Sequence, residues 1–252
     1  MLEDSFSDNI RQTKVIIKYE FKKYFEGKRI IIFGVLMALV LSLSIALPYI
    51  FGDGLSDDPT ILAYSMIGMI SLLILVSATL FASGTIVSEF EERTALVLFT
   101  KPLKKWSIYL GKVFTACVLG ILFMLVYYGV VAVVSMIVTG SIATNLLLSL
   151  GLALAYVIGT TGVAVLISSV VKKSSTAAIL TFISLLLLLT IISSILTVNS
   201  IEPWFMLDEA SMSITNCLSN ESYDALRSGS VMVIWGLVTG AIGYLAFRRR
   251  EL

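Results

Sequence analysis

The sequence contains no histidine and only two cysteines, Cys117 and Cys217, among its 252 residues. Histidine is the commonest metal ligand and the commonest general base in proteins, and two cysteines are too few for a disulfide framework or a thiolate metal site. Charge is also scarce, because charged residues make up 14% of the chain, against about a quarter in soluble proteins. The composition therefore argues against a metalloenzyme and against a disulfide-rich secreted domain.

The formal net charge of +1 excludes an ordinary nucleic-acid-binding protein, since affinity for polyanions needs a basic excess on one face. Hydrophobic residues make up 58% of the chain, and the mean hydropathy is +0.97. A chain with so few polar groups cannot cover its own surface in water. We therefore expect an all-α, polytopic membrane protein that is surrounded by membrane lipid and has no nucleic-acid partner.

Six uncharged intervals are long enough to cross a membrane, which takes about 20 mostly apolar residues. They predict helices at 30–51, 65–88, 113–139, 146–171, 175–198 and 231–247. The prolines lie at or beyond the ends of these intervals, so we expect mostly continuous helices; they are Pro48, Pro59, Pro102 and Pro203. Residues 30–252 are thus predicted to form one six-helix transmembrane domain.

The segments outside the predicted helices alternate along the chain between those that contain lysine and arginine and those that contain almost none. Of the 18 such residues, only Arg227 falls in a segment assigned to the outer side. Basic residues concentrate in cytoplasmic loops. The sequence therefore predicts a multi-pass protein of the cell membrane with both termini in the cytoplasm.

Residues 1–29 are predicted to form a cytoplasmic amphipathic helix before the first span. Ile10, Ile17, Phe21 and Tyr24 share one face of this helix, and lysines flank that face. Such a helix lies along the inner membrane surface, with its lysine stems reaching toward lipid phosphates. It serves either as an anchor or as a docking element for a cytoplasmic partner, and the sequence leaves both open.

The segment 89–112, between the second and third spans, contains an apolar run from Ala95 to Phe99. A run this short cannot cross a bilayer, so it must be buried against the protein's own helices, the membrane surface or another protein. Thr94 can cap a short helix, and Pro102 favours the start of the next one. The pattern predicts a helix, a turn and a second helix that project into the cytoplasm.

This loop resembles the cytoplasmic loop of ABC transporter permeases of the ABC-2 type. An acidic residue, an apolar turn led by threonine, a proline and a terminal Gly-Lys recur in that loop, and the corresponding residues are Glu89, Thr94, Pro102, Gly111 and Lys112. Those permeases commonly have glycine before the threonine, whereas this chain has Arg93. The basic ending, residues 247–252, is also similar to that of many such permeases.

The resemblance implies the permease subunit of an ABC exporter, which works as a homodimer or heterodimer of permeases with two cytoplasmic ATPase subunits. The residues it implies for coupling to the ATPase are Glu89, Glu91, Thr94, Leu98, Phe99 and Pro102. The chain has no GxxxxGKS/T motif for cradling phosphates. We therefore expect no catalytic, metal or cofactor site in this chain, and we expect ATP and Mg to be bound by the partner ATPase.

The segment 199–230, between the fifth and sixth spans, is acidic and is predicted to lie outside. Pro203 suits the first turn of a helix, and Trp204, Leu207, Ile214 and Leu218 would then fall on one face. This pattern favours an amphipathic helix at the outer interface over a surface loop. The resemblance implies short outer helices that dip into the membrane and close the exit, which makes Trp204 and Leu207 a candidate outer gate. The Asn220 sequon is a weak glycosylation pattern.

Serine and threonine are most frequent in the second and fifth predicted spans. The residues we assign to a substrate path are Ser77, Ser83, Thr181 and Ser184, although such hydroxyls can also bond to carbonyls of their own helix. A path without fixed charge predicts a lipid-like, hydrophobic or otherwise weakly charged cargo.

Other function classes are less well supported by the sequence. A channel or ion-coupled secondary transporter is expected to have a charged or broken helix in the membrane, and the predicted spans contain neither. An intramembrane enzyme needs a nucleophile with a base, and no ionisable acid or base lies within a predicted span. A purely structural membrane anchor also fits the composition.

Overall fold

The computed structural model describes residues 6–52, 54–91, 105–219 and 221–249, with the helical backbone alone for residues 6–12. Every regular element in these ranges is a helix, and six helical segments are long and apolar enough to cross a membrane. The predicted fold class and the number of spans are therefore confirmed. The elements are α1 (Phe6–Glu26), α2 (Lys28–Phe51), α3 (Pro59–Ile67), α4 (Ile70–Phe81), α5 (Val87–Glu91), α7 (Lys105–Thr139), α8 (Leu146–Val170), α9 (Ser174–Ile183), η1 (Ser184–Leu188), α10 (Leu189–Val198), α11 (Leu207–Asn216) and α12 (Ala225–Arg249).

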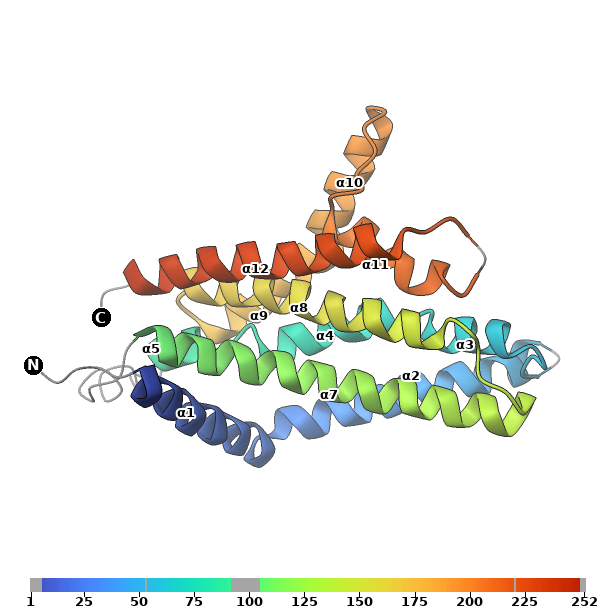
Figure 1. The fold of residues 1–252 in the computed structure, drawn as a ribbon, viewed down its shortest axis with the longest axis horizontal. Coiled ribbons are helices and arrows are strands. Elements are labelled where there is room, and N and C mark those ends of the chain that lie inside the picture. The colour runs from blue at the N-terminus through green and yellow to red at the C-terminus, as the bar shows by residue number, and fades with distance from the viewer. Residues whose placement is uncertain (1–5, 53, 92–104, 220, 250–252) are drawn as a thin grey trace, which may run out of the picture.

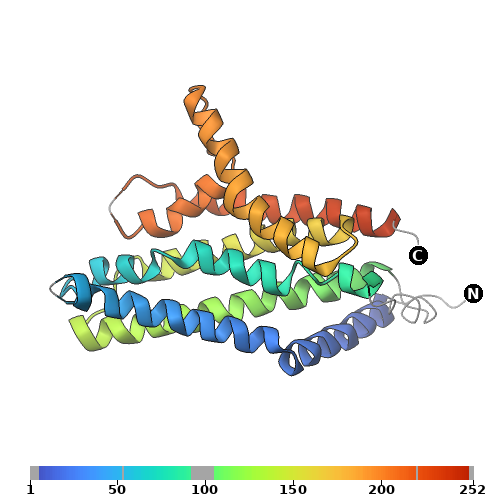
Figure 2. The ribbon, with the colours of Figure 1, turned by 180° about the vertical axis from the view of Figure 1, so that it is seen from behind.

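The helices run lengthwise through a bundle with two distinct ends (Figures 1 and 2). The first turn of α1, α5, the start of α7 and the end of α12 gather at one end, which we call the basic end. The end of α2, the α7–α8 turn and the end of α11 lie at the opposite end, which we call the far end. α7 begins at Lys105 and α12 ends at Arg249, so these basic residues lie at the basic end, while the orientation of the bundle in a membrane stays a prediction.

The second span is not the continuous helix predicted at 65–88. A turn at Gly68 and Met69 separates α3 from α4, and the chain leaves the helix again after Phe81 and turns through residues 82–86. Glycine weakens a helix interior because it has more conformational freedom to lose. The second break has a different cause, which lies in side chains from other helices.

Three side chains satisfy the backbone groups that the second break sets free. The Tyr24 hydroxyl donates to the Phe81 carbonyl at 2.5 Å, and Arg29 Nη1 donates to the Leu80 carbonyl at 3.3 Å. Ser168 Oγ accepts the N–H groups of residues 86 and 87 at 3.1 and 3.2 Å. A helix can end inside a membrane protein only where such partners exist, and the sequence of the second span does not reveal them.

The tightest helix contact in the bundle joins α8 to α12. A Cβ atom on Gly162 would lie 2.5 Å from the Gly236 carbonyl oxygen, and one on Gly236 would lie 2.6 Å from the Ile158 carbonyl oxygen. Small residues allow membrane helices to approach until their backbones touch. This pair of helices forms the framework on which α11 is placed.

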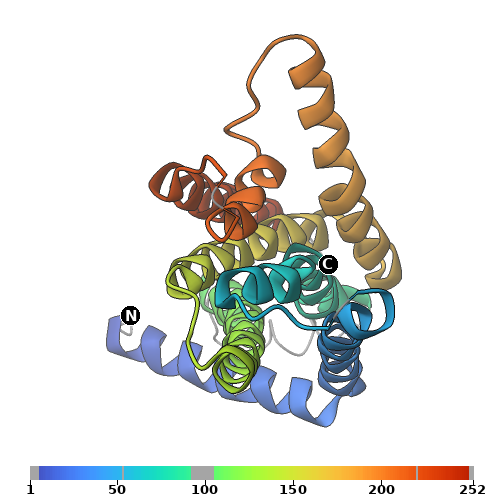
Figure 3. The same cartoon turned by 90° about the vertical axis from the view of Figure 1, so that its right-hand side faces the viewer.

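The fifth span leaves the bundle as it proceeds. It begins as α9, passes through the π-helical turn η1 and continues as α10, which projects from the side of the bundle (Figures 1 and 3). The chain then returns to the bundle at the start of α11. A π-helical turn inside a helix is frequently found at a functional position, and here it lies between the packed α9 and the projecting α10.

Candidate functional site

The short helix α5 includes the first residues of the predicted coupling loop, 89–112, and contacts several helices at once. We call its last three residues, Glu89, Phe90 and Glu91, the stem. The Phe90 ring packs edge-on against Phe247 of α12, with 6.1 Å between ring centroids. The two carboxylates contact other helices, so the stem joins residues 92–104 to different parts of the bundle.

Glu89 belongs to an ion cluster formed by Glu20, Lys23, Glu89 and Lys112. The Lys112 Nζ lies 2.5 Å from Glu20 Oε1 and 2.8 Å from Glu89 Oε1, and the Lys23 Nζ lies 3.6 Å from the same Glu89 oxygen. The side chains of Lys112, Glu20 and Glu89 are 3%, 5% and 12% exposed. Buried charges are tolerated when they are paired, so this cluster fixes α1, α5 and α7 relative to one another.

Glu91 caps a different helix. Its Oε2 accepts the backbone N–H of Ser174 at 2.8 Å, while Lys173, the residue at the N-cap position of α9, makes no side-chain cap. An anionic acceptor at a helix N-terminus satisfies a donor that lacks an intrahelical partner. The bond from the Ser174 backbone lowers the pKa of the Glu91 carboxyl. The stem therefore also holds the first turn of α9.

The remaining predicted coupling residues, Thr94, Leu98, Phe99 and Pro102, lie outside the described residues. The chain is described again from Lys105, where α7 begins. Because Glu89 precedes residues 92–104 and Lys112 follows them, the ion pair between these two side chains joins both flanks of the loop.

The amphipathic helix α1 packs against the protein as well as presenting an exposed side. A Cβ atom on Gly111 of α7 would lie 2.8 Å from Ile16 Cγ2, and Tyr24 is buried, while Phe21 packs against the core. Gly111 thus lets α1 approach α7 directly, and the position of this helix along the membrane surface stays a prediction.

The segment from Pro203 to Cys217, which we call the gate segment, enters the bundle from the side and runs out toward the far end. Trp235 Nε1 of α12 donates to the Phe205 carbonyl at 2.8 Å. A Cβ atom on Gly159 of α8 would lie 2.7 Å from Leu207 Cδ1. Trp235 and Gly159 lie near the middle of their helices, so the gate segment reaches about halfway along the bundle.

From that depth α11 runs back along α8 to the far end. The Ser149 hydroxyl donates to the Ile214 carbonyl at 2.7 Å, and Asn145 Nδ2 donates to the Cys217 carbonyl at 2.8 Å. The predicted outer helix is therefore wrong in its start, while its position relative to the membrane stays a prediction. The helix begins at Leu207 rather than at Pro203, because its apolar face is buried in the bundle.

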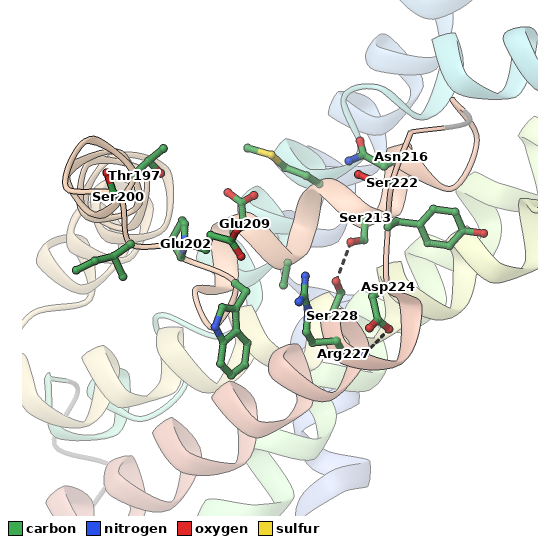
Figure 4. A pocket seen from close by; sticks show the side chains of 16 residues that line it. Thr197, Ser200, Glu202, Glu209, Ser213, Asn216, Ser222, Asp224, Arg227 and Ser228 are labelled. Atoms are coloured by element: carbon green, nitrogen blue, oxygen red, sulfur yellow. Dashed lines mark hydrogen bonds between the residues drawn. The ribbon is translucent and has the colours of Figure 1, made fainter.

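The two predicted gate residues lie in different surroundings. Leu207 is fully buried, whereas Trp204 is 48% exposed and precedes the helix. Trp204 lines a cavity of about 520 Å³ between the end of α10, α11 and the start of α12 (Figure 4). The guanidinium of Arg227 lies 5.9 Å from the Trp204 ring centroid. The cavity is otherwise acidic, with Glu202, Glu209 and Asp224 in its lining.

A family model for ABC-2 family transporter proteins matches residues 14–252. The chain belongs to the ABC-2 transporter family. No curated protein matches the chain. It is thus a multi-pass membrane subunit with the role of an ABC transporter permease, and as such it is not itself an ATPase.

The predicted path residues of the permease lie mostly in its interior. Ser77 and Ser83 are buried and donate to carbonyls of their own segment, at 2.8 and 2.5 Å. Thr181 is buried, and its hydroxyl has no hydrogen-bond partner among the described residues. Ser184 is the first residue of η1 and is partly exposed. The role of these four residues in transport stays a prediction.

The contacts of two ionisable groups of the site were not predicted from the sequence of the permease. Asp208, in the first turn of α11, lies beside Tyr156 of α8 and Thr190 of α10, although the sequence placed it in an outer loop. Lys112 was treated as the boundary of a span, although it is buried in the ion cluster. The apolar spacing of Leu207 and Ile214 was the signal for a buried helix at Asp208.

Proposed function

We propose that this permease is the membrane subunit of an ATP-driven ABC exporter in the cell membrane, with its basic end in the cytoplasm. Two permeases, identical or related, work with two ATPase subunits that bind ATP and Mg, and this chain binds no cofactor of its own. The family and the concentration of lysine and arginine at the basic end support this assignment. The absence of a phosphate-cradling GxxxxGKS/T motif from the sequence supports a separate ATPase.

The observation that carries the proposal is the set of contacts made by the stem. Glu89 pairs with Lys112 of α7, Phe90 packs on Phe247 of α12, and Glu91 caps α9 at Ser174. A displacement of residues 92–104 by an ATPase therefore acts on three spans together. Electrostatic pairs and ring packing resist separation, so the stem transmits a force rather than absorbing it.

The same helices lead to the gate segment. The span that begins with α9 ends in α10, and α10 and α12 both pack against α11. Leu207 closes the space between α8 and α12. Movement of α9 and α12 at the basic end thus reaches Leu207 from two sides, through α10 and through α12. In this mechanism Leu98 and Phe99 fill an apolar groove of the ATPase, while Thr94 and Pro102 shape the loop.

The cargo that fits this path is an amphiphile whose polar part meets hydroxyls and one carboxylate. The hydroxyls are those predicted from the sequence, Ser77, Ser83, Thr181 and Ser184. Asp208 adds a charge that the sequence-based path lacked. An ionisable group at this depth marks a polar path rather than a lipid contact, so we expect the headgroup of the cargo to be cationic or rich in hydrogen-bond donors.

The test of the proposal compares Leu98→Asp with Leu98→Met in the complex of permease and ATPase. Aspartate introduces a charge into the apolar contact, whereas methionine keeps its volume and polarity. We expect Leu98→Asp to lose the ATPase during purification, or to keep hydrolysis without transport, and Leu98→Met to behave as the parent. Full ATPase binding and transport in Leu98→Asp would contradict the proposal.

A further inference from the structure

A second cavity, of about 410 Å³, lies where the α1–α2 junction meets the turn before α5. Three of its lining side chains are cationic: Lys23, Lys28 and Arg29. Its one carboxylate, Glu20, is paired with Lys112 at 2.5 Å. The charge of the cavity is therefore positive, and its volume is in the range of pockets that hold small ligands.

The three cations differ in how many ion pairs and hydrogen bonds they form with other groups of the protein. Lys23 is shared with Glu89 at 3.6 Å. Arg29 donates from Nη1 to the Leu80 carbonyl at 3.3 Å, which leaves most of the five N–H donors of a guanidinium. Lys28 takes part in none of the ion pairs found among the described residues. Lys28 and Arg29 can therefore bind an anion without breaking the ion cluster.

A glycine shapes the wall of the cavity on the opposite side. A Cβ atom on Gly84 would lie 3.0 Å from Arg29 Nη1, so only glycine allows the guanidinium to lie against the turn at this position without displacement. The hydroxyls of Thr85 and Ser88 also line the cavity, and both residues are buried. The wall thus offers a planar guanidinium held against backbone, a geometry that suits the oxygens of a phosphate.

The position of the cavity along the bundle is that of lipid headgroups. Lys28 and Arg29 lie in the first turn of α2, the first span. Next to them in the sequence, Phe25, Ile31 and Ile32 are 65%, 66% and 53% exposed. In a membrane protein such apolar side chains face acyl chains, and basic side chains at the end of a span lie at the level of the phosphates.

We propose that this cavity binds the phosphate of an anionic phospholipid of the leaflet at the basic end. Arg29 and Lys28 contact the phosphate oxygens, and the acyl chains extend along the exposed side of α2. The bound lipid lies against Gly84 of the turn and Ser88 of α5, which precedes the stem, so it holds the turn at 82–86 and the start of α5 in place. Binding itself does not depend on the proposed coupling to an ATPase, which makes the two ideas separately testable.

Lipid binding is measured on the purified full chain by native mass spectrometry, with phosphatidylglycerol, phosphatidylcholine and inorganic phosphate as probes. The double variant Lys28→Gln with Arg29→Gln removes two cations of the cavity. The matched control, Arg248→Gln with Arg249→Gln, removes two exposed cations from the last turn of α12 that do not line it. Lys28→Gln alone tests the site if the loss of the bond to Leu80 prevents folding of the double variant.

We expect phosphatidylglycerol to bind the parent more tightly than phosphatidylcholine. We expect the cavity variant to lose about thirtyfold in affinity, the loss expected when two basic contacts to an anionic lipid are removed, and the control to keep the affinity of the parent. Equal losses in the two double variants would overturn the proposal, because they would show a general charge effect. Displacement of the lipid by millimolar inorganic phosphate would overturn it as well, since the ligand would then be a free anion.

Discussion

The Lys112 Nζ lies 2.8 Å from Glu89 Oε1, so the residues on either side of the loop 92–104 form an ion pair. Glu20 completes the charge balance on the other side of the ammonium, at 2.5 Å. One lysine thereby connects the amphipathic helix, the stem and the longest helix of the permease. Its contacts lead directly to the first prediction.

Lys112→Met should destabilise the permease strongly. The substitution removes the ammonium between the buried carboxylates of Glu20 and Glu89 and leaves Glu89 with Lys23 at 3.6 Å. Loss of one partner of a buried ion pair costs about 3 to 5 kcal/mol. Thermal unfolding of the purified permease measures the change. Lys18→Met, at an exposed position of α1, is the control and should unfold like the parent. Equal unfolding temperatures for Lys112→Met and the parent would contradict the role of the ion cluster.

Glu91→Gln should weaken the permease at neutral pH and have no effect in acid. The pKa of Glu91 is lowered in the folded state by the bond from the Ser174 backbone. A lowered folded pKa gives stability that is present above the unfolded pKa and is lost as the pH falls through the folded value. The unfolding temperatures of parent and variant should therefore differ at pH 7, begin to converge near the ordinary carboxyl pKa of about 4, and coincide only below the lowered pKa of the folded state. A difference that persists unchanged in acid would refute the capping role.

Two glycines of α8 should respond to alanine in opposite directions. In Gly162→Ala the new Cβ atom would lie 2.5 Å from the Gly236 carbonyl oxygen, whereas nothing lies within 4 Å of a Cβ atom on Gly151. Overpacking costs about 1 to 3 kcal/mol, while alanine in an open helix position gains up to about 1 kcal/mol over glycine. Unfolding of the two variants in one detergent gives the comparison. A Gly162→Ala permease as stable as Gly151→Ala would contradict the close packing of α8 on α12.

Asp208→Asn should reduce the response of the ATPase complex to cationic amphiphiles. The carboxylate lies beside Tyr156 and Thr190 at about half the depth of the bundle, where a cationic headgroup would meet it. We expect about a tenfold higher concentration of a cationic dye for half-maximal stimulation of ATP hydrolysis, equivalent to about 1.4 kcal/mol. Glu202→Gln, at an exposed position before the gate segment, is the control. An unchanged response in Asp208→Asn would remove Asp208 from the path.

The sequence predicted the six spans because length, apolar content and the absence of charge depend on each helix alone. It failed where a helix depends on partners from elsewhere in the chain. The end of α4 at Phe81 requires the Tyr24 hydroxyl, and the turn before α5 requires Ser168, which lie far away in sequence. In the same way, the gate segment is buried because Gly159 leaves room for Leu207.

For the stem residues as well, the sequence indicated which residue types matter but not which residues they contact. Glu89 was selected because an acidic residue recurs in this loop of the family, and Glu91 lies beside it, but the partners of the two carboxylates were not predictable. Lys112 and Ser174 are reached only once α7 and α9 have packed beside α5. For the loop residues Leu98 and Phe99, the sequence-based prediction still stands alone.

We propose that the stem transmits movement of the ATPase to the gate segment. The most direct test labels a residue of the gate segment in permeases with and without a substitution in the stem. Met212→Cys, in a permease with Cys117 and Cys217 replaced by alanine, places a thiol in the cavity beside α11. The rate of its reaction with an impermeant maleimide is measured with and without trapped nucleotide on the ATPase. In the parent complex, the rate of the maleimide reaction should change when nucleotide is trapped. The Glu89→Gln variant, which leaves Lys112 paired with Glu20, should still hydrolyse ATP, but its rate of maleimide reaction should not change on trapping. A full nucleotide-dependent change in Glu89→Gln would contradict the account.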